Sequence, residues 1–290
     1  MIFEMNRWIG FIILVLVLSC DGCVDSLLLY PTTRPEPAGG AVERLIDRDG
    51  KKIQVWIAHS QRAAQAPPQA MVLDFTGNAT RAEWVVASEA RRWGSKPVEI
   101  WVMNYPGYGG SSGRASVSAI PPAALAVYDT MAAENPGKPI FVTGSSLGCA
   151  TALSVASRRP TAGMVLENPP PIQRMILQEH GWWNLWLGAG AAAMQIPPEM
   201  DALVTAPRVK SPAVFIMSRM DRTVPYSYQR LVFEAYAGER RSLLRETADH
   251  NTPLAPSDEQ AFQQLLDWLW SRAAVPGNAQ SRFVPARFML

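Results

Sequence analysis

The sequence predicts an α/β domain with a largely parallel central sheet. Short apolar runs without polar alternation recur along the chain, as is typical of strands buried on both faces of a parallel sheet. Ala-rich stretches with helix spacing separate these runs, and each is long enough for a crossover helix. A half-apolar hairpin precedes the repeat, so the expected order is a hairpin followed by strand–helix–strand units.

Each element has its own signal. The hairpin is predicted from the alternation in residues 41–59, where Asp49-Gly50 separates two half-apolar runs. Buried strands are expected at residues 71–75, 98–103, 140–143, 163–166 and 213–217. Crossover helices are expected at about 80–93, 122–134 and 147–158. A last strand near 242–245 precedes a helix over 259–271, whose apolar residues fall at helix spacing.

Length and composition exclude several classes of protein. At 290 residues the chain suits one α/β domain with an insertion, so we expect one main domain. Apolar residues make up 48% and charged residues 18%, which excludes a disordered or coiled-coil chain. The net charge is +2 with no run of basic residues, so nucleic acid is not an expected partner. Three cysteines, Cys20, Cys23 and Cys149, are too few for a disulfide framework or a four-ligand zinc site.

The N-terminus resembles an export signal. Residues 8–18 read WIGFIILVLVL without a charge, which is short for a membrane-spanning helix of about 20 residues and right for a secretory signal. The letters VLSC at 17–20 resemble the lipobox of bacterial lipoproteins, which implies acylation at Cys20 and a membrane-anchored place in a bacterial envelope. An ordinary signal peptide and an uncleaved anchor are the alternatives. We therefore expect a signal at 1–20, a Pro- and Gly-rich linker at 21–40 and the folded domain at 41–290.

One interval interrupts the alternation of strands and helices. Between positions 168 and 212 lie about 40 residues with an apolar GAGAAAM stretch and three tryptophans, Trp182, Trp183 and Trp186. Loops of this length are usually functional lids or disordered, and this one is too apolar to be disordered. We expect a small helical cap at about 169–211, with packing of the tryptophans against the sheet as the alternative.

A serine on a tight turn is the candidate nucleophile. The predicted strand at 140–143 runs into Gly144-Ser145-Ser146-Leu147-Gly148, and helical sequence follows at once. Such a turn strains its central residue and presents the side chain, while the flanking glycines leave room for it. A second match to the same G-x-S-x-G pattern, at 109–113, neither follows its strand directly nor opens a helix. The context therefore selects Ser146.

The nucleophile needs a base, and the base needs an acceptor that orients it. Of the three histidines, His59 ends the hairpin, His180 lies in the expected cap and His250 follows the last predicted strand. We therefore expect His250 to be the base. Asp221 follows a late predicted strand and is the expected acid, with Glu167 as the alternative.

The order of nucleophile, acid and base is that of the α/β-hydrolases. Three further segments resemble the small serine hydrolases of that superfamily related to eukaryotic lysophospholipases and protein depalmitoylases. FTGNAT at 75–80 resembles their HGN loop, NYPGYGGSSG at 104–113 their DYRGYG-type loop and SRMDRTVP at 218–225 their acid-bearing loop. The resemblance covers about residues 72–270.

The resemblance implies the α/β-hydrolase fold, a mostly parallel sheet flanked by helices with a small helical cap. It also implies an oxyanion hole formed by the backbone N–H groups of Asn78 and Leu147. Thr76 stands where the family usually has His. Because the expected donors are backbone groups, the oxyanion hole does not require that histidine.

Together these residues predict a serine hydrolase that cleaves a carboxylic ester or thioester. Ser146 would attack, His250 would transfer the proton and Asp221 would orient the imidazole, through an acyl-enzyme that water hydrolyses. The apolar cap favours a hydrophobic acyl group, and a small-molecule or lipid ester is the expected partner.

Other chemistries lack their motifs. The chain has no phosphate-binding GxxxxGK[ST] loop, no complete dinucleotide fingerprint and no HExxH or paired CxxC motifs, so neither a cofactor nor a metal is expected. A non-catalytic binding protein on the same fold is one alternative, because fold does not fix function. A serine peptidase is another, because amides and esters are cleaved by the same three groups.

Overall fold

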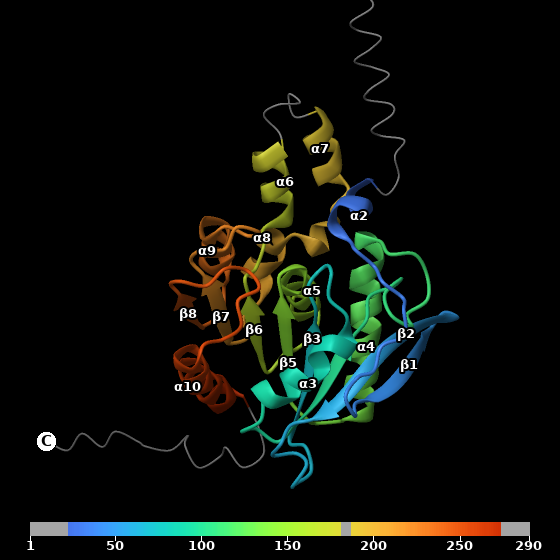
Figure 1. The fold of residues 1–290 in the computed structure, drawn as a ribbon, viewed down its shortest axis with the longest axis vertical. Coiled ribbons are helices and arrows are strands. Elements are labelled where there is room, and N and C mark those ends of the chain that lie inside the picture. The colour runs from blue at the N-terminus through green and yellow to red at the C-terminus, as the bar shows by residue number, and fades with distance from the viewer. Residues whose placement is uncertain (1–22, 181–186, 274–290) are drawn as a thin grey trace, which may run out of the picture.

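The computed structural model describes residues 23–180 and 187–273, whose strands form one sheet with helices on both faces (Figure 1). The strands are β1 Val42–Arg48, β2 Lys51–His59, β3 Ala70–Phe75, β4 Val98–Met103, β5 Ile140–Ser145, β6 Gly163–Glu167, β7 Ala213–Ser218 and β8 Arg240–Arg245. Their order across the sheet is β1-β2-β4-β3-β5-β6-β7-β8. β2 is antiparallel to β1 and β4, while β3 to β8 are parallel to one another. The predicted hairpin and largely parallel sheet are therefore confirmed.

The hairpin turns where the sequence predicts. β1 and β2 pair down to Arg48 and Lys51, so only Asp49 and Gly50 form the turn. Both have positive φ, 53° and 77°, as a two-residue turn matched to strand twist requires. Asp-Gly is one of the sequences that adopt this geometry readily.

The helices form two layers. α3 Ala82–Arg92 and α10 Pro256–Arg272 cover one face, and α4 Ile120–Glu134, α5 Leu147–Ala156, α8 Ala202–Thr205 and α9 Tyr226–Ala235 cover the other. Along β3, Met71, Leu73 and Phe75 enter one apolar core, whereas Ala70 and Val72 enter the other. The predicted strands lack polar alternation because both of their faces are covered.

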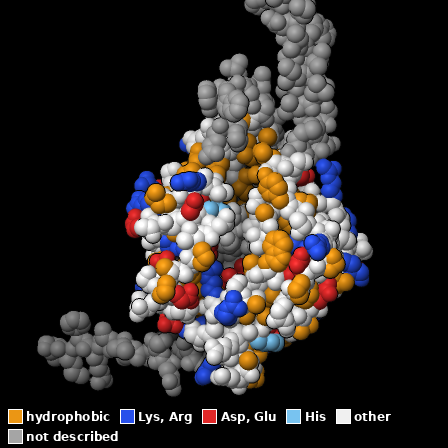
Figure 2. All heavy atoms as spheres, viewed as in Figure 1, with side chains coloured by type: hydrophobic (Ala, Val, Ile, Leu, Met, Phe, Trp, Pro, Cys, Tyr) orange, Lys and Arg blue, Asp and Glu red, His pale blue; other side chains and the backbone are white. Residues whose placement is uncertain are grey.

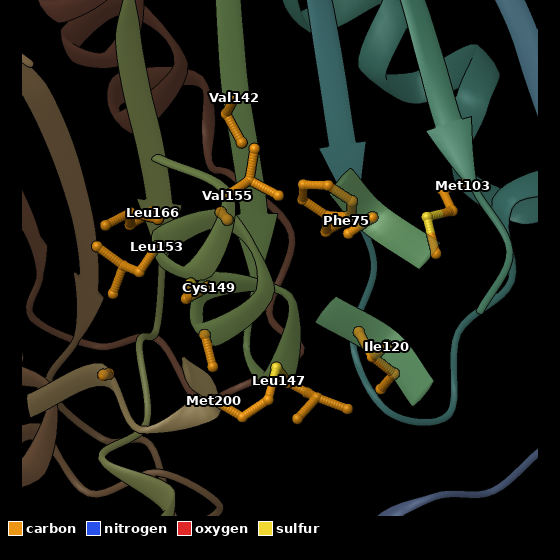
Figure 3. Close-up of a cluster of buried hydrophobic side chains, with 14 of the residues drawn as sticks. Phe75, Met103, Ile120, Val142, Leu147, Cys149, Leu153, Val155, Leu166 and Met200 are labelled. Carbon is orange, nitrogen blue, oxygen red and sulfur yellow. The ribbon is translucent and has the colours of Figure 1, made fainter. Parts of the chain in front are cut away.

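The core on the α5 side supports the turn that carries Ser146. Figure 3 shows Leu153 and Val155 of α5 beside Val142 of β5 and Leu166 of β6. All four side chains are fully buried. This packing fixes α5 against the ends of the two central strands.

The sequence does not predict α9. Its fully buried residues are Gln229 and Val232, and Tyr226 and Phe233 pack against the same core, so its inner face combines apolar side chains with a buried glutamine. The three crossover helices that the sequence predicts correspond to α3, α4 and α5. The helix predicted over 259–271 corresponds to α10.

Helices fill the interval between β6 and β7. They are α6 Ile172–His180, α7 Leu187–Met194, η3 Pro198–Met200, α8 and η4 Ala206–Arg208. α6 and α7 pack together and project beyond the sheet (Figure 1). The expected helical cap is therefore present, whereas Trp182, Trp183 and Trp186 lie outside the described residues.

The prediction of a linker at 21–40 is wrong for residues 23–28, which form a helix. Residues of α2 Cys23–Leu28 pack onto the domain beside α7, and Val24 and Leu29 are buried (Figure 1). The Asp25 carboxylate accepts a hydrogen bond of 2.8 Å from the backbone N–H of Val117. The proline and glycine content suggests a tether, but burial of the apolar side chains within 24–29 is more favourable than their exposure to water.

The segment with Cys20 lies outside the described residues. Within residues 23–180 and 187–273, no helix combines the length and the apolar character that crossing a bilayer requires.

Candidate active site

Ser146 occupies a strained turn between β5 and α5. Its backbone has φ 53° and ψ −122°, a conformation that non-glycine residues rarely adopt. A Cβ on Gly148 would lie 1.9 Å from the carbonyl oxygen of Phe75, and one on Gly144 would lie 2.4 Å from that of Gly148. Only glycine fits at these two positions, which explains the pattern on both sides of Ser146.

Hydrogen bonds hold the turn to the neighbouring strand. The Ser146 N–H donates to the Glu167 carbonyl over 2.8 Å, and the Cys149 N–H donates to the Ser146 carbonyl over 2.9 Å. The Cys149 thiol donates to the carbonyls of Gly144 and Glu167. Burial raises the pKa of this thiol, so it stays protonated and acts as a structural donor within the turn.

A pocket of about 220 Å³ opens beside Ser146. Its described lining is mostly apolar: Leu27, Leu28, Asn78, Ser146, Leu147, Pro170, Ile172, Met175, Ile176, Thr223 and Val224. No residue of this lining carries a formal charge. The pocket is therefore suited to an uncharged, apolar group placed next to the serine hydroxyl.

The structure brings Asp221 and His250 together. Asp221 Oδ2 lies 2.7 Å from His250 Nδ1, and the Asp221 side chain is fully buried. Asp221 Oδ1 also accepts the N–H groups of Thr223 and Val224, over 2.8 and 2.7 Å. Because Nδ1 faces the carboxylate, Nε2 is the ring nitrogen left for a reacting group.

Gln229 is a further partner of the carboxylate. Its Nε2 donates to Asp221 Oδ2 over 3.0 Å, and its Oε1 accepts the N–H of Ser218 over 3.0 Å. Gln229 is fully buried. The sequence gives no signal for it, because a single glutamine on a half-polar helix has no distinctive pattern.

Glu167, the alternative acid, has other partners. Its carboxylate pairs with Arg92 over 2.8 Å and with Arg245 over 3.6 Å. These arginines come from α3 and β8. The carboxylate of Glu167 therefore binds two guanidinium groups, whereas that of Asp221 binds the imidazole.

Ser146 and His250 belong to one edge of the sheet. Asn168, the residue after β6, donates from Nδ2 to the His250 carbonyl over 3.1 Å, and the preceding Glu167 carbonyl accepts from Ser146. In the described part of the chain, no hydrogen bond joins the Ser146 hydroxyl to the imidazole. Such catalytic contacts are often long before substrate binds and tighten in the reacting complex.

Asn78 and Leu147 line the pocket together with Ser146. The Asn78 carbonyl accepts the Tyr108 hydroxyl over 2.6 Å and the Tyr30 N–H over 3.3 Å. Burial raises the pKa of Tyr108 to about 12, so this hydroxyl keeps its proton at neutral pH. The segment at 104–113 therefore braces the loop at 75–80.

Thr76 closes its own loop. Its hydroxyl donates to the Thr80 carbonyl over 3.0 Å, and its carbonyl accepts the Tyr105 hydroxyl over 2.8 Å. The loop thus keeps a fixed shape with threonine where the resembled family has histidine.

The second G-x-S-x-G match serves the loop structure. Ser111 is buried, donates to the Asn104 carbonyl and accepts the N–H of Gln54, each over 2.8 Å. Both hydrogen bonds of its hydroxyl are thus made to backbone groups.

The remaining histidines lie elsewhere in the chain. His59 pairs with Glu99 over 3.0 Å, and His180 ends α6. Among the residues of known placement, no group of three or more His, Cys, Asp or Glu side chains is arranged to hold a metal ion.

Three comparisons place the chain among known proteins. A family model described as serine aminopeptidase, S33, matches residues 66–196. Two uncharacterised proteins of Mycobacterium tuberculosis, from strains CDC 1551 / Oshkosh and ATCC 25618 / H37Rv, are each 25% identical to it over 239 residues. The alignment covers 78% of this chain and 80% of either relative.

Solved structures share the fold. An esterase of Pyrococcus furiosus has a TM-score of 0.63 at 15% identity, over 84% of this chain and 97% of the esterase. An acylaminoacyl peptidase of Pyrococcus horikoshii has a TM-score of 0.61 at 13% identity, over 80% of this chain and 41% of the peptidase. At these identities the likeness shows a common fold.

Proposed function

We propose that this chain, an α/β-hydrolase by its fold, is a serine hydrolase that cleaves a carboxylic ester or thioester with a hydrophobic acyl group. One observation carries the proposal. Ser146 sits in a strained turn and lines an apolar pocket that is also lined by Thr223 and Val224, whose N–H groups hold the carboxylate bound to His250. The esterase and the peptidase among the similar structures support it.

The first half of the reaction forms an acyl-enzyme. Ser146 Oγ attacks the carbonyl carbon while His250 Nε2 accepts the hydroxyl proton, and the carbonyl electron pair moves onto the oxygen. The ionised Asp221 stabilises the imidazolium. The N–H groups of Asn78 and Leu147, which both line the pocket with Ser146, would bind the oxyanion. The Leu147 N–H suits this role because it opens α5 and has no intrahelical acceptor. The electron pair then returns, the bond to the leaving oxygen or sulfur breaks, and the leaving group takes the proton from His250.

The second half regenerates the enzyme. Water gives a proton to His250 Nε2 as its oxygen attacks the acyl carbon. Collapse of the second tetrahedral intermediate breaks the bond to Ser146 Oγ, which regains the proton from His250 and releases the carboxylic acid. Atoms and charge balance without a cofactor.

The experiment that tests the proposal is labelling with a fluorophosphonate, which phosphonylates an activated serine. We expect the folded wild type to be labelled and Ser146→Ala to lose labelling and at least 10³-fold of its p-nitrophenyl ester hydrolysis. Ser111→Ala is the matched control, because it removes the serine of the other G-x-S-x-G segment. Absence of labelling in well-folded wild type would favour the non-catalytic binding protein instead.

A serine peptidase is the second candidate function. The matching family model and the similar peptidase structure favour it. Rates on acyl p-nitrophenyl esters, acyl thioesters and peptide p-nitroanilides separate the two: hydrolysis of anilides at rates comparable with the esters would assign a peptidase.

We also propose that the chain is exported and held at a membrane of a bacterial envelope through an acylated Cys20. The support is the uncharged run at 8–18 followed by the lipobox-like letters at 17–20.

A further inference from the structure

We infer that α2 forms part of the acyl-binding site and sets the preferred length of the acyl chain at about six to nine carbons. The inference rests on the proposed function, because it assigns the pocket beside Ser146 to the acyl group. It concerns a segment that the sequence predicts to be a tether.

Two helices that are distant in sequence wall the pocket. α2 contributes Leu27 and Leu28, and α6 contributes Ile172, Met175 and Ile176, with Ser146 at the same cavity. An acyl chain whose carbonyl is at Ser146 would therefore pass between leucines of α2 and side chains of the cap.

α2 is fixed in this position by its own contacts. Val24 and Leu29 are buried in the main core, and Asp25 accepts the N–H of Val117 while its carbonyl accepts that of Leu29, each over 2.8 Å. Leu27 is 47% exposed, so it stands at the open side of the pocket. α2 therefore packs on the domain and forms one side of the pocket, with Leu27 at the pocket opening.

The segment after α2 also contacts the loop that carries Asn78. The Tyr30 N–H lies 3.0 Å from the Tyr108 hydroxyl, which donates to the Asn78 carbonyl, and the Tyr30 hydroxyl donates to the Leu27 carbonyl. The wall of the acyl site and the candidate oxyanion loop are therefore joined by a short series of hydrogen bonds.

The size and polarity of the pocket determine the acyl class. An enclosed apolar cavity of about 150 Å³ holds benzene, with six carbons, so the 220 Å³ of this open pocket covers about six to nine acyl carbons, and further carbons would pass Leu27 into solvent. The described lining has no charge to pair with a zwitterionic or ionised group. An uncharged, medium-length acyl group fits both properties.

The experiment compares kcat/KM over p-nitrophenyl esters from acetate to palmitate. We expect the wild type to prefer hexanoate and octanoate, because each buried methylene is worth about fourfold. Leu27→Trp should lower the octanoate-to-acetate ratio about tenfold, since it fills the space of about two methylenes. Leu28→Ala should move the optimum towards decanoate or longer.

Control variants separate α2 from the rest of the pocket. Leu45→Ala removes an exposed leucine on β1 and should leave the chain-length profile unchanged. Ile176→Trp fills the opposite wall and should also shorten the preferred chain. Fluorophosphonate titration gives the fraction of competent enzyme, so folding losses do not distort the ratios.

The outcomes are distinguishable. If Ile176→Trp shortens the preferred chain but neither α2 variant changes it, α2 is not a determinant and the inference fails. A flat wild-type profile with normal labelling also overturns it while leaving the serine hydrolase intact. If wild type neither labels nor hydrolyses any ester, the proposed function itself is wrong.

Discussion

Ser146 keeps its positive φ only because its surroundings impose it. Non-glycine residues in such regions cost about 1–3 kcal/mol each. The cost is offset by the packing of α5 and by the hydrogen bond from the Ser146 N–H to the Glu167 carbonyl. The strain is thus stored at the residue that the proposed chemistry uses.

Asp221→Asn is expected to lower kcat by about 10⁴-fold and also to lower stability, because its amide nitrogen would face the buried Gln229 Nε2 donor. The asparagine can still accept the N–H groups of Thr223 and Val224, but its amide nitrogen at the imidazole would favour the wrong tautomer of His250. Ester hydrolysis at saturating substrate measures the effect.

Glu167→Gln is the matched comparison for the acid. It should keep most of its activity per folded molecule, because its carboxylate pairs with Arg92 and Arg245. A larger kcat loss in Glu167→Gln than in Asp221→Asn would assign the acid to Glu167.

The sequence identifies both carboxylates but cannot choose between them on geometry. Asp221 and Glu167 each follow a predicted strand, and parallel strands bring their carboxyl ends to one edge. Which one meets the histidine depends on side-chain direction and on partners such as Gln229, which carry no local sequence signal.

Charged side chains tie separate elements together behind the turn of Ser146. Glu167 at the end of β6 pairs with Arg92 of α3 and Arg245 of β8. Arg245 Nη2 donates to the carbonyls of Thr252 and Pro253, two and three residues after His250. Glu167, the alternative acid, thus supports the loop that carries the candidate base through Arg245.

Asp74 of β3 is expected to weaken the fold at neutral pH. Burial, with a smaller contribution from the charge of Glu89, raises its pKa well above the ordinary value. The folded state therefore holds a proton that the unfolded chain releases above about pH 3.9. Stability is fully present below that pH and is lost as pH rises towards the folded-state pKa.

Asp74→Asn should remove this loss. The amide oxygen can still accept the Thr143 hydroxyl, which lies 2.5 Å from Asp74 Oδ1. We expect equal melting temperatures near pH 4 and an advantage for the variant that grows to about 2–4 °C by pH 8. Calorimetry across this range measures it, and a difference independent of pH would contradict the raised pKa.

Elements differ in how well the sequence predicts them. The central strands are predicted because burial on both faces leaves uninterrupted apolar runs. α9 and α2 are not, since α9 places a buried glutamine on its inner face and α2 is six residues long among prolines and glycines. Short helices of this kind are set by tertiary packing, not by local pattern.

In the whole molecule, one of the exposed apolar areas lies at the end where the cap projects. Figure 2 shows hydrophobic side chains where α6, α7 and α2 lie in Figure 1. Leu27 and Met194 are 47% and 72% exposed. The sequence predicts the cap, but not the pairing of α2 with α7, because that contact joins segments about 160 residues apart.

Cys20→Ser tests the anchor. In a bacterial host, the wild type should incorporate radioactive palmitate and sediment with membranes, and the variant should lose the label. Cys23→Ser is the matched control and should keep it. Label retained in Cys20→Ser would contradict lipidation at that residue.

Because α2 packs on the domain, the distance between the domain and Cys20 is limited by a short segment of chain. From Cys20 to Cys23 the chain advances three residues, which reach at most about 10 Å when extended. If Cys20 carries acyl chains, the pocket opening beside Leu27 would lie at a distance of roughly one helix diameter from the lipid headgroups. The rate of turnover would then depend on the surface density of substrate in the leaflet. Diluting the substrate within the surface with detergent, at constant bulk substrate concentration, would slow turnover.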